Sequence, residues 1–266
     1  MSLRRCFSTL GCPELSLDAA LALAEKHEVF AIEVRALGGT IDLPAWFATH
    51  HGLPFQLAAR LRESRAGIVA LDASLRLTAA TADAREQLGA LAAWADAAGV
   101  AWLRVFDGDG GADDRAFTAA GETLAWWRAL RSEHRWKCDI MVETHDSLFT
   151  ADAITRFRAA FPGTAILWDA HHTWRKGGED PVATWNSIRP AVVHVHVKDS
   201  ISVPGPRHPF TYVLPGDGEF PIAPLRDALR RDQFEGPVSL EWEKLWHPNL
   251  PPLDDALAAA AARKWW

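Results

Sequence analysis

Short apolar runs, many of them rich in β-branched residues, alternate along the chain with longer segments rich in alanine and leucine. Such short runs are typical of buried strands, whereas the longer segments place apolar residues at helical spacing. For example, Leu17, Leu21 and Ala24 follow Ser16, a residue type that commonly begins a helix. The predicted strands cover residues 4–9, 30–35, 67–72, 101–106, 138–142, 166–168, 192–199 and 238–240.

This alternation predicts a closed barrel of parallel strands. Strands that alternate with helices form a parallel sheet, and eight such units favour closure. The length of 266 residues is close to the roughly 250 of a TIM barrel, and a doubly wound sheet would be expected to carry a glycine-rich dinucleotide fingerprint. We therefore predict an α/β fold, a single (β/α)8 TIM barrel domain over residues 1–266, with long loops on its active face at 170–181 and 200–220.

Composition and charge indicate which kind of binding partner and which cellular compartment to expect. The net charge of −6 argues against a general electrostatic surface for nucleic acid, so the expected partner is a small molecule. Three cysteines, an odd number, indicate reduced thiols rather than a disulfide framework. Residues 1–8 lack the apolar stretch of a signal peptide, and no run is long enough to span a membrane. A cytoplasmic protein is predicted.

Four strand-like runs in the second half of the chain carry metal-type ligands near their ends: Glu143, Asp169, His196 and Glu241. In a parallel barrel the carboxyl ends of all strands open on one face, where these side chains would converge. Buried carboxylates and imidazoles are costly unless they are paired or bind an ion. Because the set is rich in oxygen and has no thiolate, one divalent ion is predicted, with Mn²⁺, Mg²⁺ or Co²⁺ favoured and catalytic Zn²⁺ also compatible.

Period-two alternation separates the inward from the outward residues. On the seventh strand it assigns one face to His194, His196 and Lys198, and the other to Val193, Val195 and Val197. It also directs Glu33, Arg35 and Arg104 into the barrel. The alternative for these three is that they only neutralise one another in the core.

Several segments together resemble a known family: Glu143-Thr144-His145-Asp146, Asp169-Ala170-His171-His172, His194-Val195-His196-Val197-Lys198-Asp199, Gly216-Asp217-Gly218-Glu219 and Leu240-Glu241-Trp242-Glu243. They look like the xylose isomerase-like TIM barrels, also called the sugar phosphate isomerase/epimerase superfamily. The first two strands fit as well, so the resemblance spans nearly the whole chain. It implies one divalent metal held by Glu143, Asp169, His196 and Glu241, and it implies that His172 contacts the substrate or a second metal.

The superfamily includes ketose 3-epimerases, isomerases, dehydratases and apurinic endonucleases, so the resemblance leaves the substrate open. We predict a metal-dependent isomerase or epimerase acting on a keto sugar, a sugar phosphate or a cyclitol. Glu143 and Glu241 would move protons through a metal-stabilised enediolate. A dehydratase, or lyase, is the alternative, because the same enediolate can expel a β-hydroxyl group. An endonuclease-like hydrolase is disfavoured, since strands two and three lack terminal histidines, and a non-catalytic sugar-binding barrel is disfavoured because all four predicted ligands are present.

Further residues are candidates for substrate contacts. The expected hydrogen-bonding groups are His145, His172, Lys198, Arg207, His208 and Glu243. Trp174 and Trp246 would cover an apolar sugar face, and Arg35 and Arg104 would bind a phosphate or carboxylate. The alternative role for Arg207 and His208 is to order their own loop.

At the C-terminus, Trp265 and Trp266 are expected to dock either within the chain or in a homodimer.

Overall fold

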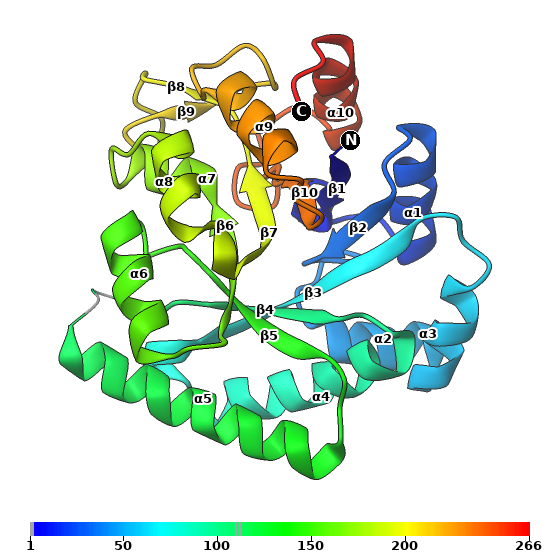
Figure 1. The fold of residues 1–266 in the computed structure, drawn as a ribbon. Coiled ribbons are helices and arrows are strands. Elements are labelled where there is room, and N and C mark those ends of the chain that lie inside the picture. The colour runs from blue at the N-terminus through cyan, green and yellow to red at the C-terminus, as the bar shows by residue number, and fades with distance from the viewer. Residues whose placement is uncertain (1–2, 110, 112) are drawn as a thin grey trace.

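The computed structural model describes residues 3–109, 111 and 113–266, and it contains the predicted closed barrel (Figure 1). Parallel strands pair around the ring in the order β1-β10-β7-β6-β5-β4-β3-β2. The barrel strands are β1 (Arg4–Ser8), β2 (Ala31–Val34), β3 (Gly67–Arg76), β4 (Trp102–Phe106), β5 (Asp139–Glu143), β6 (Ala165–Asp169), β7 (Val192–Val197) and β10 (Pro237–Leu240).

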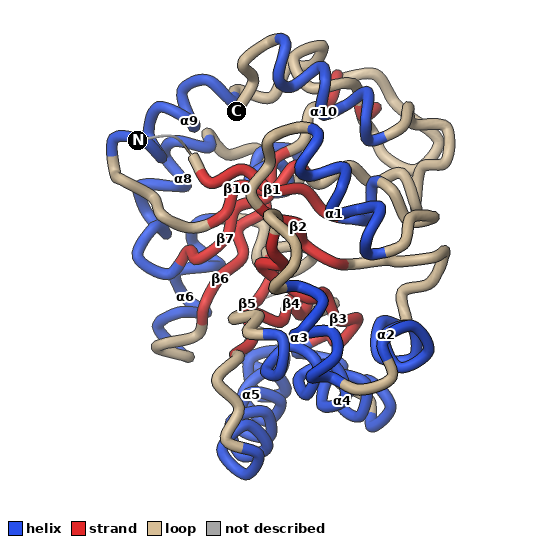
Figure 2. Tube along the Cα trace, turned by 90° about the vertical axis from the view of Figure 1, so that its right-hand side faces the viewer, coloured by secondary structure: helices blue, strands red, loops and turns tan. Residues whose placement is uncertain are grey.

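Helices surround the strands in both views of the molecule (Figures 1 and 2). They are α1 (Leu17–Lys26), α2 (Leu43–His51), α3 (Pro54–Leu61), α4 (Ala82–Ala98), α5 (Asp114–His134), α6 (Ala151–Ala160), α7 (Ala170–Arg175), α8 (Pro181–Ile188), α9 (Ile222–Arg231) and α10 (Leu253–Ala262). The predicted helix start at Ser16 is confirmed, because its side chain accepts a hydrogen bond from the N–H of Ala19.

The hydrophobic core has two parts. The larger cluster includes outward-facing strand residues such as Val195 and Val197, whereas Ala70, Met141 and Leu167 form a small cluster of their own. Val193 packs against this second cluster, so its predicted place beside the other two valines is wrong. The physical reason is a shift in the β6–β7 register: Ile166 pairs with Val192 and Leu167 with His194, so Val193 is an extra residue that breaks the alternation.

The two long connections are more ordered than the sequence predicts. The segment 170–181 begins with α7, which starts directly after β6, because the Asp169 side chain accepts a hydrogen bond from the N–H of His172. The segment 200–220 contains an antiparallel pair, β8 (Ser200–Ile201) and β9 (Thr211–Tyr212). The Asp199 carboxylate fixes this segment by accepting backbone hydrogen bonds from Gly216, Gly218 and Phe220.

The C-terminal aromatic residues dock within the chain. Trp265 and Trp266 are 4% and 7% exposed, and the Trp265 ring lies 6.4 Å from that of Phe220. In the part of the chain that the structure describes, no helix is both long and apolar enough to cross a membrane. The prediction for residues 1–8 rests partly on Met1 and Ser2, which lie outside the described residues.

Candidate metal centre and active site

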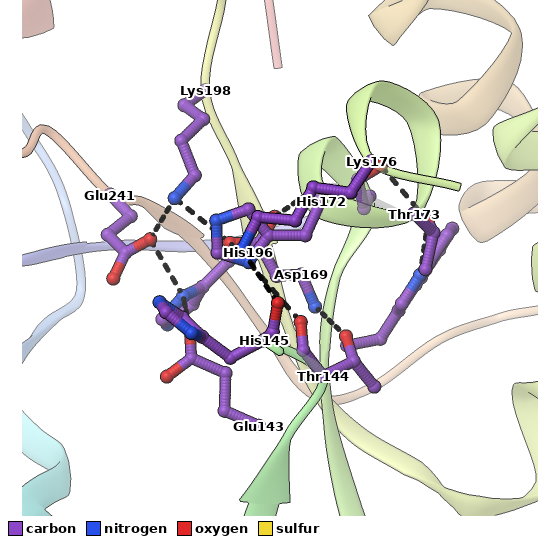
Figure 3. Close-up of polar contacts among 12 residues, drawn as sticks. Glu143, Thr144, His145, Asp169, His172, Thr173, Lys176, His196, Lys198 and Glu241 are labelled. Atoms are coloured by element: carbon purple, nitrogen blue, oxygen red, sulfur yellow. Dashed lines mark hydrogen bonds and ion pairs between the residues drawn. The ribbon is translucent and has the colours of Figure 1, made fainter. Parts of the chain in front are cut away.

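The four predicted metal ligands come together at the carboxyl ends of β5, β6, β7 and β10. One side-chain ligand atom from each of Glu143, Asp169, His196 and Glu241 lies within 4.8 Å of the others, and all four residues are buried (Figure 3). Nδ1 of His196 is 3.6 Å from Oε1 of Glu143 and 3.3 Å from Oε2 of Glu241. Within the described residues, neither the carboxylate oxygens of Glu143 nor Nδ1 of His196 have a hydrogen-bond partner.

This donor set fits a divalent cation. Buried oxygen and nitrogen atoms without partners are costly, and a shared ion would satisfy them together. Two permanent cations contact the three carboxylates: Arg104 lies 3.2 Å from Glu143, and Lys198 contacts both Asp169 and Glu241. Negative charge therefore remains for an ion to offset. The metal-binding role of these residues stays a prediction.

Local structure fixes the orientation of Asp169. Its backbone N–H donates to Oγ1 of Thr144, and its Oδ1 accepts from the N–H of His172 at the start of α7. This leaves Oδ2 to face the ligand group, 2.9 Å from Nζ of Lys198. Asp169 therefore caps the start of α7 through Oδ1 and faces the other predicted ligands through Oδ2.

Glu33 connects the centre to the opposite side of the barrel. Its carboxylate lies 2.9 Å from Nε2 of His196 and 3.0 Å from Nε2 of His194, and all three residues are fully buried. Metal-ligating histidines commonly donate their second N–H to a carboxylate in this way. Burial is outweighed by Glu33 and Glu241, which raise the pKa of His196; a bound ion would take the place of the Nδ1 proton, with Nε2 still donating to Glu33. The sequence directed Glu33 inward but did not assign it a site role.

Lys198 and Glu243 extend the centre toward the β8–β9 segment. Nζ of Lys198 lies 2.6 Å from Oε1 of Glu243 and also contacts Glu241, and the Tyr212 hydroxyl donates to Oε1 of Glu243 at 2.8 Å. Tyr212 was missed by sequence reasoning, because only the folded β8–β9 segment brings it to Glu243.

The charges of neighbouring residues set the ionisation of the carboxylates. Burial alone would raise the pKa of Glu241, but Lys198 and His196 outweigh it and hold that pKa well below its usual range. For Glu143, burial is likewise outweighed, chiefly by Arg104, and its pKa is lowered. Burial dominates at Asp169 and raises its pKa to about 6, despite Lys198. Both predicted proton carriers are therefore ionised bases at neutral pH.

His145 and His172, which are predicted to contact the substrate, lie beside the ligand group. Their rings are 4.7 Å apart, and Nδ1 of His172 is 3.1 Å from Oδ2 of Asp169. Nδ1 of His145 lies 2.8 Å from Oδ2 of Asp146. The loop that carries His145 is held by the buried Asp107, whose carboxylate accepts hydrogen bonds from the backbone N–H groups of residues 145–148. Nothing in the sequence pointed to Asp107 beyond its place just after β4.

Arg35 and Arg104 lie on the other half of the barrel mouth, formed by β2, β3 and β4. Arg104 contacts Glu143 and also Asp72, whose Oδ2 is 3.4 Å from its Nη2. The alternative that Glu33, Arg35 and Arg104 neutralise one another is therefore wrong, because Arg104 pairs with two other acids. Glu33 instead pairs with the two histidines, and Arg35 has different partners. Asp72 is a further residue that the sequence did not assign to the site.

The remaining candidates gather farther from the ligands. Arg207, His208 and Trp246 line a cavity of about 320 Å³ that Tyr212 also borders. Nη1 of Arg207 donates to the carbonyl of Trp246 at 2.6 Å, which links the loop of Arg207 to the segment after β10. Trp174 does not join them in this cavity lining: its ring packs 5.4 Å from that of Phe220.

The sequence profile described as "Xylose isomerase-like TIM barrel" matches residues 21–266. The chain belongs to this family. The family assignment agrees with the observed fold and with a centre at the carboxyl ends of the strands. No curated protein sequence matches the chain.

Several solved structures of xylose isomerase-like barrels and related proteins are similar to this chain. The "probable 3-DHS dehydratase AsbF" of Bacillus anthracis has 17% identity and a TM-score of 0.77, over 97% of this chain and 99% of that one. The IolI protein "with a binding zinc atom" has 16% identity and a TM-score of 0.75, over 99% of each chain. A "D-tagatose 3-epimerase-like protein" has 13% identity and a TM-score of 0.69, over 98% and 96%. At these identities the likeness concerns the fold.

Proposed function

We propose that the protein is a divalent-metal-dependent isomerase or epimerase that moves a proton next to the carbonyl of a keto sugar, sugar phosphate or cyclitol. The observation that carries this proposal is the convergence of Glu143, Asp169, His196 and Glu241, with ligand atoms within 4.8 Å of one another. Two barrels of similar fold, one named as an epimerase-like protein and one as binding zinc, support it.

All four residues would hold the ion, and two of them would also transfer protons. Glu143, Asp169, His196 and Glu241 would hold the ion, which, when bound, supplies Lewis-acid stabilisation of negative charge on a substrate oxygen. Glu143 at the end of β5 and Glu241 just after β10 come from strands separated in the ring by β6 and β7. They would therefore flank a substrate from two sides.

Proton transfer follows from this placement. One glutamate removes the proton from the carbon next to the carbonyl, and the other, after taking a proton from solvent, donates it to the opposite face, which inverts that carbon; the first glutamate then releases its proton to solvent. Return to the neighbouring carbon would instead give isomerisation. Lys198, whose ammonium contacts Glu241 and Glu243, and His172, beside Asp169, would orient substrate oxygens.

A second candidate function is dehydration, and His145 favours it. Its Nδ1 lies 2.8 Å from Oδ2 of Asp146, and this carboxylate, together with Glu143, outweighs burial and raises the pKa of His145, which favours the protonated imidazole that can donate a proton. Expulsion of a hydroxyl group as water needs such a proton donor close to the base. The similar barrel from Bacillus anthracis, named as a probable dehydratase, is consistent with this candidate.

The test is solvent-deuterium exchange on a panel of keto sugars, inososes and their phosphates, without a redox cofactor. A cognate substrate should take up deuterium at the carbon next to its carbonyl. Replacement by glutamine at Glu143 or Glu241 should lower turnover by about 10²-fold or more, since each position loses a proton carrier but keeps an oxygen ligand. An epimeric product supports epimerisation and a dehydrated one supports the second candidate. Unchanged turnover in both variants would contradict the acid–base assignment.

A further inference from the structure

Two arginines are buried in the half of the barrel mouth that lacks metal ligands. Arg35 follows β2 and Arg104 lies on β4, with β3 between them, and the two residues are only 4% and 2% exposed. The four predicted ligands come from β5 and β6, β7 and the end of β10. The four predicted ligands therefore lie in one half of the mouth, and the two arginines lie in the other, together with the buried acids Glu33 and Asp72.

The two arginines differ in how their charge is compensated. Arg104 contacts carboxylates of Glu143 and Asp72. Arg35 donates only to neutral groups, the carbonyl of Asp72 at 3.4 Å and the hydroxyl of Ser74 at 3.0 Å. Throughout the described residues no carboxylate oxygen is paired within 4.0 Å of it, and the other positions, Met1, Ser2, Gly110 and Ala112, have no carboxylate side chain.

A buried guanidinium without a counter-ion is unfavourable, because it loses hydration without gaining a partner. Burial and the positive charge of Arg104 lower the pKa of Arg35 to about 10, and the more distant charges of Asp72, Glu143 and Glu241 offset this only in part. The backbone of Arg35 is nevertheless held firmly in place, since its N–H donates to Oγ1 of Thr9 at 2.9 Å. The fold thus positions a charge that none of its own acids pairs with.

We infer that Arg35 binds an anionic group of the substrate, which makes the substrate a keto polyol bearing an oxyanion. This inference rests on the proposed function, since the same molecule must reach the metal ligands with its carbonyl. The Arg35 head contacts Ser74, an exposed residue of β3, so the guanidinium lies at the edge of the mouth. One planar fork with a single charge matches a carboxylate in a bidentate pair, and a phosphate ester shares the same oxyanion chemistry.

The alternative role for Arg35 is structural: its two hydrogen bonds would only hold β3 against β2. The roles differ in what they predict for substrates. A structural arginine affects neutral and anionic compounds alike, whereas an anion-binding arginine affects only the anionic ones. Arg189 provides a matched control, because it lies before β7 at the opposite end of the barrel and pairs with Asp232 at 2.8 Å.

The experiment compares deuterium exchange and dissociation constants for matched neutral, carboxylated and phosphorylated keto polyols. Metal-loaded wild type should prefer an anionic member by about 10- to 150-fold, the range expected for one hydrogen bond to a charged group. R35Q should abolish this preference while metal content stays within about twofold, and R189Q should change neither the preference nor the metal content. R35K should retain part of the preference, because it keeps the charge but loses the planar fork.

The outcomes separate the hypotheses. Preference for the carboxylate or for the phosphate identifies which oxyanion is recognised. An unchanged preference in R35Q, or no preference in wild type, overturns the inference; if R35Q does not fold, full preference in R35K overturns the bidentate role. Absence of exchange on every compound refutes the proposed function instead, and the anion preference is then decided by the dissociation constants.

Discussion

Replacing Glu33 by glutamine tests how the barrel prepares His196 for an ion. In the native site the carboxylate lies within hydrogen-bonding distance of Nε2 of both His194 and His196. When an ion is bound, His196 would be a neutral imidazole with a single N–H, so donation from Nε2 would leave the Nδ1 lone pair, on the side of Glu143 and Glu241, for the ion. A glutamine has one acceptor oxygen and one NH₂ donor. Its oxygen can accept from both rings at the position of Oε2, but its NH₂ then lies where Oε1 is, 3.0 Å from Nε2 of His196, and disfavours the Nε2–H tautomer of that ring.

The expected loss of metal affinity is moderate, because Glu33 contacts the predicted ligand His196 but is not itself one of the four predicted ligands. Loss of such a partner typically weakens metal binding by about 10- to 100-fold. This range corresponds to roughly 1.4 to 2.7 kcal/mol. We expect Glu33→Gln to fall within it, because all four ligand side chains remain present. His196→Ala, which deletes a ligand, should remove most of the ion.

Metal affinity can be measured by competition with a chelator of known strength, and the tautomers of His194 and His196 by ¹⁵N nuclear magnetic resonance of their rings. Glu122→Gln is the matched control, since Glu122 is exposed on α5. Glu33→Gln should show both weaker binding and a changed histidine tautomer. Metal affinity equal to that of wild type, with both tautomers unchanged, would refute the reasoning.

Two other expectations concern stability. If the site holds one divalent ion that binds only the folded state, metal at 100 times its dissociation constant adds about 2.7 kcal/mol to the unfolding free energy. Chelation should then lower the Tm in calorimetry, and an unchanged Tm in protein shown to be metal-loaded would contradict this. Trp265 is 4% exposed, so Trp265→Ala should cost about 3–5 kcal/mol in denaturant unfolding. A cost below about 1 kcal/mol would show that the tail contributes no docking energy, and size-exclusion chromatography of the same variant tests the predicted homodimer.

Much of the fold was predictable because local pattern and global architecture agree. Apolar runs end at Glu143 and Asp169, and β5 and β6 end at these same residues. Period-two alternation correctly directed His194 and His196 into the barrel, where both are fully buried. The convergence of four ligands needed only the rule that parallel strands open on one face.

The wrong and missing predictions concern contacts between distant segments, which the pattern of a single strand does not reveal. Val193 faces the inner cluster because of a shift in register with β6, which no single-strand pattern reveals. The sequence placed Glu33 inward but could not show that it pairs with histidines of β7 rather than with an arginine. Asp72 and Tyr212 were missed because their partners, Arg104 and Glu243, come from other segments of the chain.

The contact between Glu33 and His196 has a consequence for the order of folding. These residues are 163 positions apart, and β2 and β7 are not neighbours in the ring, so the contact depends on β1 and β10 joining the two halves. A segment with all four ligands, such as residues 138–266, would still lack Glu33. Contacts between such distant residues form late, after the entropy of chain closure has been overcome. Tight ion binding should therefore appear only when the ring closes, and its rate would report that closing step.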